Sequence, residues 1–409
     1  MIEITAPVGS FECLRAAIKA RADSVYFGVG ELNMRSHSAE NFKVEDLPEI
    51  ATICKSANVR NYLTLNTIIY DDDFDEMKKI LDAAKNSGVD AVIACDMAVI
   101  KYANSIGLSV HSSTQLNISN IEAVEFYSKY VDVVVLAREL KLEQIRKICD
   151  GIRARNIRGP SGELVKVEIF CHGALCVSIS GKCYMSLATH GFSANRGKCF
   201  QTCRRKYKVI DEEDGNELIV DNNYVMSPKD LCTIGFLDKI LDSGVDILKI
   251  EGRARGADYV YTVTKTYKEA AENYFSGTYS QEKIEKWINE LSKVFNRGFW
   301  HGGYYLGKEL GEWANCSGSQ ATQKKFLIGK VVHYYDKINI AHLDIEEIIK
   351  FGDELIITGS TTGIVEFIVG EVFKNGELVE GEVKGKDVSV KVPEKVRKND
   401  RVWLIRKIE

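Results

Sequence analysis

A short apolar run followed by an amphipathic segment recurs eight times in the first part of this sequence. The first run, residues 2–7, precedes a helical spacing that Ser10 is placed to cap. The eighth, residues 246–252, precedes a long closing helix. Eight such units with near-continuously apolar strands predict a parallel sheet closed into a (β/α)8 TIM-type barrel. An open doubly wound sheet would also alternate, but the count of eight and the lack of a GxGxxG turn favour the barrel.

The pattern changes twice after the barrel. Residues 280–323 combine a short helix with the aromatic–glycine stretch FNRGFWHGGYYLG, and we interpret them as a linker region. Residues 324–409 consist of β-rich runs broken by Gly, Asn and Asp, which predict a small all-β barrel or sandwich domain. A barrel over residues 1–279 with this appendage accounts for the 409 residues.

Bulk features narrow the class of protein. No run of about 18 apolar residues occurs, and the N-terminal stretch lacks the pattern of a signal peptide, so we expect a cytoplasmic protein without a membrane span. The formal net charge of -4 does not by itself predict a nucleic-acid binder, although a local basic run could bind one. In a reducing compartment the cysteines are expected to be thiols or metal ligands.

Six of the eleven cysteines lie between residues 171 and 232, in an insertion after the seventh strand. Zinc sites usually use paired CxxC knuckles, and none occurs here. Wide, uneven spacing with thiolate ligands fits a 4Fe–4S cluster at least as well as zinc. Six candidates for four positions leave the ligands open, and Cys171 continues a buried strand, where it can simply pack. The single cysteines outside this stretch are expected to be buried small hydrophobes: Cys13, Cys54, Cys95, Cys149 and Cys316.

Polar residues follow most of the predicted strands, where TIM-type barrels carry their chemistry. These candidates are Arg35, Asn66, His111, Gln115, Arg138, His172, Glu251 and Arg253. Arginines that face one cavity suit a carboxylate-bearing small molecule, and histidines transfer protons near neutral pH. Taken singly, an Arg–Glu pair is as often a structural rim pair, and a histidine is more often only a hydrogen-bonding residue. The joint placement at strand ends favours a site.

A basic run surrounds the cysteines, with Phe200 and Tyr207 interleaved. Its members are Arg196, Lys198, Arg204, Arg205 and Lys206. Basic side chains with aromatic neighbours suit RNA phosphates and an unstacked base, whereas the alternative is a solvated charged face. The C-terminal β domain would serve either as a nucleic-acid platform or as a docking domain.

Several blocks of the sequence resemble one family. They are EIFCHGALCVSISGKCYMS, ADSVYFGVGELNMRSHSAENF, HSSTQLNISN, ANRGKCFQTCRRKY, SPKDLC, LKIEGRAR and FNRGFWHGGYYLG. Together they resemble the collagenase-like peptidase family of unassigned catalytic type, number thirty-two in its class. One departure is Arg21, where the family commonly has glycine at a helix end. The resemblance implies an oxygen-independent hydroxylase of an RNA base or a quinone precursor.

The resemblance also implies a cofactor, a donor and their ligands. It implies a 4Fe–4S cluster, with prephenate as the hydroxyl donor, and prephenate is a dicarboxylate that agrees with the arginines. Carried over by motif, the cluster ligands would be Cys176, Cys183, Cys199 and Cys232, with Cys203 as the reserve. Family members make 5-hydroxyuridine at the tRNA wobble position or hydroxylate a ribosomal cytidine.

The leading hypothesis is therefore a tRNA hydroxylase of the wobble uridine. In it, His111, His172 and Glu251 are catalytic, and Arg35, Asn66, Gln115, Arg138 and Arg253 bind the small substrate. The alternatives are a hydroxylase of rRNA or of a ubiquinone precursor, a collagenase-like peptidase, and a non-catalytic iron–sulfur partner that binds RNA. No HExxH or GxSxG motif supports a peptidase, and neighbouring Cys171 and His172 would point to opposite faces of a strand.

Overall fold

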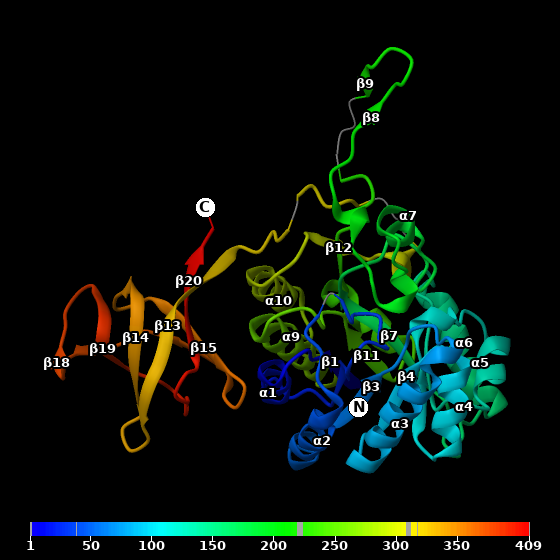
Figure 1. Ribbon diagram of the computed structural model, residues 1–409, viewed down its shortest axis with the longest axis horizontal. Coiled ribbons are helices and arrows are strands. Elements are labelled where there is room, and N and C mark those ends of the chain that lie inside the picture. The colour runs from blue at the N-terminus through cyan, green and yellow to red at the C-terminus, as the bar shows by residue number, and fades with distance from the viewer. Residues whose placement is uncertain (1, 38, 219–223, 308–311, 317, 409) are drawn as a thin grey trace.

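The computed structural model describes residues 2–37, 39–218, 224–307, 312–316 and 318–408. Its larger body is a closed barrel of eight parallel strands (Figure 1). In chain order these are β1 (Glu3–Pro7), β2 (Ser24–Gly28), β3 (Arg60–Thr64), β4 (Ala91–Ala94), β5 (Ser109–Ser112), β6 (Val133–Val135), β7 (Lys166–Gly173) and β11 (Ile247–Ile250). Each strand pairs with the next, and β11 pairs with both β7 and β1, which closes the ring.

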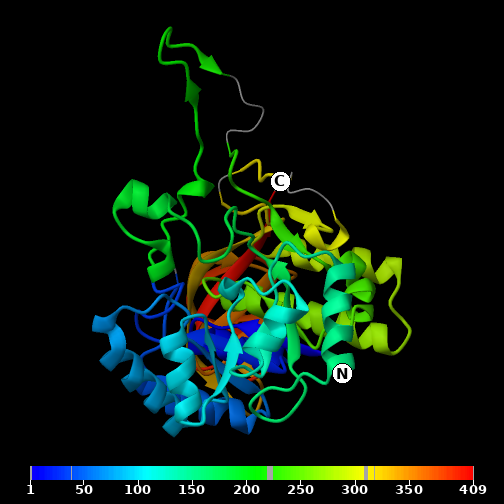
Figure 2. The same ribbon diagram turned by 90° about the vertical axis from the view of Figure 1, so that its right-hand side faces the viewer.

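Helices surround this barrel (Figure 2), so the predicted TIM-type fold is confirmed. They are α1 (Phe11–Lys19), α2 (Leu47–Ser56), α3 (Phe74–Ser87), α4 (Met97–Ser105), α5 (Ile121–Tyr127), α6 (Leu142–Arg155), α8 (Leu237–Asp242) and α9 (Ala257–Phe275). The Ser10 side chain accepts the amide N–H of Cys13 and caps α1 as predicted. Arg21, just past α1, has a φ of 64°, a conformation that glycine adopts without strain, and its side chain pairs with Glu272 at 2.9 Å.

The segment between β7 and β11 builds most of one end of the molecule. It contains α7 (Met185–His190), the hairpin of β8 (Val209–Ile210) and β9 (Glu217–Leu218), and β10 (Asp230–Cys232). The hairpin projects from the barrel in both views (Figures 1 and 2). Strand β10 runs antiparallel to β7 and parallel to β12 (Phe299–His301). Single 3-10 turns are η1 (Val44–Asp46), η2 (Asp71–Asp73), η3 (Thr114–Leu116), η4 (Ala194–Arg196), η5 (Thr202–Arg204), η6 (Ile234–Phe236) and η7 (Tyr304–Leu306).

The region interpreted as a linker packs on the barrel. Helix α10 (Gln281–Lys293) buries Trp287 and Leu291 in the same core as the barrel strands. Helix α10 packs against α9 and η6, while β12 pairs with β10 of the insertion. No helix in the described residues is long and apolar enough to cross a membrane.

The C-terminal domain is an antiparallel sheet of eight strands, which confirms the all-β prediction. The strands are β13 (Gln323–Tyr335), β14 (Ile340–Ile349), β15 (Glu354–Gly359), β16 (Gly363–Ile368), β17 (Val372–Lys374), β18 (Glu377–Leu378), β19 (Val383–Lys391) and β20 (Arg401–Lys407). Their alternating Val, Leu and Ile side chains form a separate core. Ion pairs join this domain to the barrel helices: Lys19–Glu394 at 2.7 Å, Arg401–Glu12 at 2.6 Å and Lys325–Asp258 at 2.5 Å.

Candidate active site at the barrel mouth

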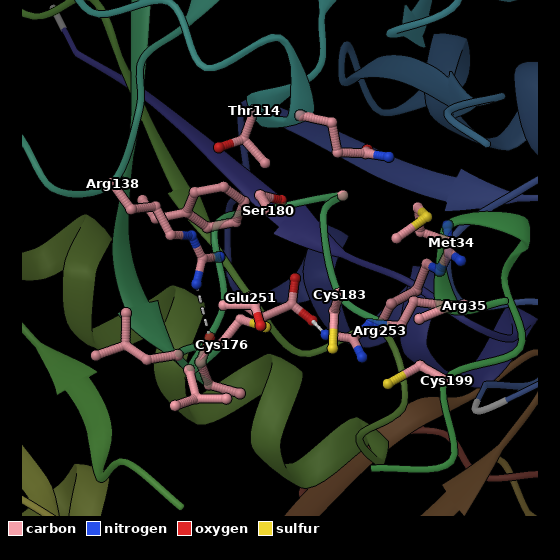
Figure 3. A pocket seen from close by; sticks show the side chains of 18 of the residues that line it. Met34, Arg35, Thr114, Arg138, Cys176, Ser180, Cys183, Cys199, Glu251 and Arg253 are labelled. Atoms are coloured by element: carbon pink, nitrogen blue, oxygen red, sulfur yellow. Dashed lines mark hydrogen bonds and ion pairs between the residues drawn. The ribbon is translucent and has the colours of Figure 1, made fainter. Parts of the chain in front are cut away.

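A cavity of about 560 Å³ lies between the strand ends and the cysteine-rich insertion. Its lining includes Tyr26 and Thr64 from the strands and the insertion loop that follows β7. The carboxyl ends of parallel barrel strands meet at this face, so their side chains converge here. The insertion closes over them and forms the opposite wall of the cavity (Figure 3).

Glu251, just after β11, is a central acid of the cavity. Its Oε1 accepts from Arg35 Nη2 at 2.7 Å, and its Oε2 accepts from the Tyr26 hydroxyl at 3.3 Å. Burial raises the pKa of Glu251, but Arg35, Arg138 and Arg253 together outweigh burial, so its pKa lies below the ordinary value. Glu251 is therefore a carboxylate at neutral pH. It holds arginines in place. Glu251 was predicted to be catalytic, and its lowered pKa does not suit proton transfer near neutral pH.

Arg253 is nearly fully buried, at 3% exposed. Its two terminal nitrogens donate to Thr64 Oγ1 and Asn33 Oδ1, and its Nε has no acceptor among the described residues. Burial lowers the pKa of Arg253 to about 10, so it still carries its charge at neutral pH. A buried cation with one donor unused is suited to an anionic ligand.

Arg138 enters the cavity from the end of β6. Its Nη1 donates to the carbonyl of Ala174 at 2.9 Å, and its guanidinium carbon lies 3.9 Å from the centre of the Phe170 ring. Its Nε also lacks an acceptor among the described residues. Figure 3 shows Arg138, Arg35 and Arg253 grouped about Glu251. The structure thus brings together the three arginines predicted to bind a carboxylate.

The predicted amides lie on the same cavity wall. Asn66 Nδ2 donates to Gln115 Oε1 at 3.0 Å, and Gln115 Nε2 returns a bond to the Asn66 carbonyl at 2.6 Å. Ser113 Oγ also donates to Gln115 Oε1, at 2.7 Å. Gly181 of the insertion lies on Gln115, where an added Cβ would come within 2.8 Å of its Cγ, and its φ is 73°. This close approach seats the insertion on the barrel mouth.

Four cysteines of the insertion line the cavity: Cys176, Cys183, Cys199 and Cys203. Burial raises the pKa of the Cys203 thiol, and the nearby thiols of Cys176, Cys199 and Cys183 raise it further. Figure 3 shows the side chains of Cys176 and Cys183 near Glu251, and that of Cys199 near Arg35. No three His, Cys, Asp or Glu side chains within the described residues are grouped closely enough to hold one metal ion. The ligands of a cubane cluster need not lie as close together as the ligands of a single ion, because each thiolate binds a different iron atom.

The structure does not bring Cys232 to this group. Strand β10 pairs Cys232 with His172 of β7, and its thiol is fully buried in the core. Burial raises the pKa of Cys232 to about 12, so it is held as a neutral thiol. Cys203, predicted as the substitute ligand, lines the cavity instead. Cys171 is likewise buried, and its Sγ donates to the carbonyl of Lys249 at 3.4 Å, in agreement with a packing role.

Neither histidine predicted to be catalytic lines the cavity. The His111 side chain lies inside the barrel, with its ring 4.4 Å from that of Tyr62. The His172 side chain points from β7 towards α9, with its Nδ1 3.3 Å from the Tyr267 hydroxyl. Burial lowers the pKa of each to about 3. Both are therefore neutral and enclosed, because their strand positions direct the side chains into packed layers rather than to the strand ends.

The predicted RNA-binding residues divide into two groups. Arg196 is an internal tether, since it pairs with Asp73 at 2.5 Å and lies 4.2 Å from the Tyr70 ring. Arg204 points into the cavity wall, where it donates to the carbonyls of Leu175 and Pro228. The others lie nearer to solvent: Lys198 is half-buried, and Arg205 and Lys206 are exposed.

The sequence reasoning missed several charged residues of the cavity. Lys249 of β11 forms a buried ion pair of 2.7 Å with Glu168, and Asp230, Arg255 and Arg297 lie together on another wall. The lysine inside the apolar run of β11 could have predicted a buried ion pair, because a buried charge needs a partner. Arg297 and Asp230 lie far apart in the sequence, and only the pairing of β10 with β12 brings their segments together.

Comparison with known proteins places this geometry in context. A family model described as Peptidase family U32 matches residues 9–315. A protein named collagenase from Porphyromonas gingivalis is 53% identical over 408 residues, covering 100% of this chain and 98% of that protein. The tRNA hydroxylation protein P1 of Bacillus subtilis is 31% identical over 369 residues, covering 87% of this chain and 83% of that protein. A 23S rRNA 5-hydroxycytidine synthase of Escherichia coli is 34% identical over 269 residues, covering 66% of this chain and 39% of that protein.

Proposed function

Because the chain belongs to peptidase family U32, and its relatives include proteins named for tRNA and rRNA hydroxylation, we propose that it is an oxygen-independent RNA hydroxylase. Its acceptor in this proposal is the wobble uridine of a tRNA, which becomes 5-hydroxyuridine, with prephenate as the hydroxyl donor. A wobble base is already unpaired in its loop, so it reaches a recessed cavity at little cost.

One observation carries the proposal: a single cavity is lined both by arginines and by four cysteines. Arg35, Arg138 and Arg253 suit the carboxylates of a small dicarboxylic acid, because guanidinium groups bind carboxylates through two parallel hydrogen bonds. Glu251 keeps Arg35 oriented, and Arg138 and Arg253 each retain a buried donor for a ligand. These side chains bind and orient the donor, while the insertion shields it from water.

The cysteines fit a 4Fe–4S cluster by their chemistry. Cys176, Cys183, Cys199 and Cys203 are four soft sulfur donors that line one cavity, and cysteine thiolates are the usual ligands of iron–sulfur clusters. These four residues would hold the cluster. When bound, it would supply a Lewis-acidic or redox-active iron beside the arginines.

A peptidase is the second candidate, favoured by the relative named collagenase. A cysteine peptidase needs a thiolate beside an imidazole at the surface of a cleft. Cys171 and His172 do not meet this requirement, because both are buried and burial raises the pKa of Cys171 and lowers that of His172 to about 3. The cavity chemistry therefore favours hydroxylation over peptide hydrolysis.

The decisive experiment compares tRNA nucleosides by mass spectrometry in a deletion strain and in the same strain complemented with wild type or Arg138→Gln. We expect 5-hydroxyuridine derivatives to be absent in the deletion strain and restored only by wild type. Unchanged 5-hydroxyuridine in the deletion strain would refute the tRNA assignment. Gelatin cleavage by anaerobically purified protein, abolished by one point substitution, would favour the peptidase instead.

A further inference from the structure

A second group of arginines lines the cavity apart from those around Glu251. It consists of Arg204, Arg255 and Arg297, which we call the arginine triad. The three residues come from distant segments: the insertion, the loop after β11, and the turn after α10. Such a convergence of cations in one partly enclosed place requires a physical explanation, because like charges repel.

Asp230 is the carboxylate that pairs directly with the triad. Asp230 Oδ1 lies 3.3 Å from Arg297 Nη1, and Asp230 Oδ2 accepts the backbone N–H of Arg297 at 3.3 Å. Asp230 is 3% exposed and Arg297 is 9% exposed, so this ion pair is poorly solvated. The pair fixes Arg297 in the cavity wall. It neutralises only one of the three guanidinium groups.

Arg255 shares an aromatic platform with Arg297. The guanidinium carbons of Arg255 and Arg297 lie 3.3 Å and 5.1 Å from the centre of the Phe295 ring. This ring holds the Arg255 guanidinium in place by cation–π attraction. Among the described residues, no hydrogen-bond acceptor is found for that guanidinium, so its donors remain available.

Arg204 completes the group from the insertion. Its Nη1 donates to Ser227 Oγ at 3.1 Å and to the Pro228 carbonyl at 2.6 Å. Burial lowers the pKa of both Arg204 and Arg255, and the nearby Arg297 lowers both further. Asp230 also acts on Arg204 and Arg255, and Glu251, which already pairs with Arg35, acts on Arg255. The three cations still outnumber these carboxylates, and a bound anion would offset the excess of positive charge.

We propose that the arginine triad is a phosphate subsite, which takes a phosphodiester group of the acceptor nucleic acid beside the reacting base. This assignment rests on the proposed RNA-hydroxylase function and deepens it. Guanidinium groups bind phosphate oxygens as well as carboxylate oxygens, and groups from separate segments can contact one phosphate together. In the proposed function, Arg35, Arg138 and Arg253 already bind the carboxylates of the small donor. A base that enters the mouth carries a phosphate on its own backbone.

The test uses the full chain with two probes, uridine 3′,5′-bisphosphate and an RNA stem-loop. Arg255→Gln removes one charge without breaking a hydrogen bond of the described structure, and Arg255→Lys restores the charge. Arg146→Gln, exposed on the outer helix α6, is the matched control. We expect Arg255→Gln to weaken the binding of both probes about tenfold. It should also reduce the slope of log affinity against log salt concentration by about one. Arg255→Lys should regain that slope, and Arg146→Gln should match wild type.

Several outcomes would overturn the subsite. Equal binding of both probes by Arg255→Gln and Arg146→Gln would overturn it, as would weakened prephenate binding with nucleotide binding intact, which would assign the triad to the small donor. The proposed function is tested separately by hydroxylation. If wild type binds the bisphosphate through Arg255 but modifies no RNA, the subsite stands and the hydroxylase assignment fails. If Arg255→Gln hydroxylates RNA with an unchanged KM, the subsite fails and the function stands.

Discussion

Two sets of cysteines from one sequence cluster differ in their surroundings. Cys176, Cys183, Cys199 and Cys203 lie on loops and short turns of the insertion and line the cavity. Cys171 and Cys232 lie on paired strands and are fully buried. A loop thiol can approach a ligand, whereas a strand thiol packed between layers cannot leave its neighbours. The comparison separates sulfur atoms suited to binding a ligand from sulfur atoms that fill space. The sequence pattern indicated this packing role for Cys171 but not for Cys232.

The largest expected difference is between Cys203→Ala and Cys232→Ala. After anaerobic purification, we expect Cys203→Ala to lose most bound iron and sulfide together with its activity, because a cluster ligand is removed. Cys232→Ala should keep the iron and lose about 1–2 kcal/mol of unfolding free energy, because it leaves a small core void. Metal analysis and urea unfolding measure the two effects. Loss of iron from Cys232→Ala alone would reverse the assignment.

A second contrast concerns Glu251 in the cavity. Glu251→Gln removes the carboxylate partner of Arg35, so we expect activity to fall about 100-fold through misplacement of the donor. Because the folded pKa of Glu251 is lowered, its contribution to stability is present above the unfolded value near 4.5 and is lost as pH falls through the lower folded value. Urea unfolding at pH 7 and pH 4 should therefore show a smaller pH dependence in Glu251→Gln.

The control for Glu251 is Glu143→Gln on the outer surface of α6, where the side chain is 79% exposed. We expect it to match wild type in activity and in pH dependence. Equal pH dependence of wild type and Glu251→Gln would contradict the electrostatic role.

The enclosed histidines supply a third contrast. Burial lowers the pKa of His111 and His172 to about 3, so their imidazole NMR signals should not titrate between pH 8 and pH 5. In the unfolded chain they take up protons near pH 6.5, so these residues reduce the free energy of unfolding as pH falls from about 6.5 towards 3. Titration of either signal near pH 6.5 would show that its ring reaches solvent and would restore it as a catalytic candidate.

The smallest expected effect belongs to the exposed basic residues. Lys206→Gln should weaken binding of an RNA stem-loop about two- to fivefold and lower the salt slope by less than the triad variant does, because an exposed charge is well screened. Lys101→Gln on α4 is the control. A larger loss for Lys206→Gln than for Arg255→Gln would place the main RNA contact on the outer surface.

Local patterns predicted the fold better than the site. The eight alternations of strand and helix predicted the barrel, because the hydrophobic periodicity of each element depends on residues close together in the sequence. The Ser10 cap was predicted from a similarly local pattern. The three arginines after β2, β6 and β11 were predicted because parallel strand ends share one face. The same rule misplaced His111 and His172, which lie within the strands rather than beyond them.

By itself, the sequence determined a closed parallel barrel, a separate β domain, and the types of side chain at the mouth, since these depend on short-range periodicity and on where each strand stops. Only the tertiary structure decided that Cys203 rather than Cys232 joins the cavity thiols, and that Asp230 meets Arg297. The physical reason is strand pairing: β10 adds to β7 in an antiparallel register that turns Cys232 inward and brings β12 alongside. No periodicity within the chain specifies such a long-range register.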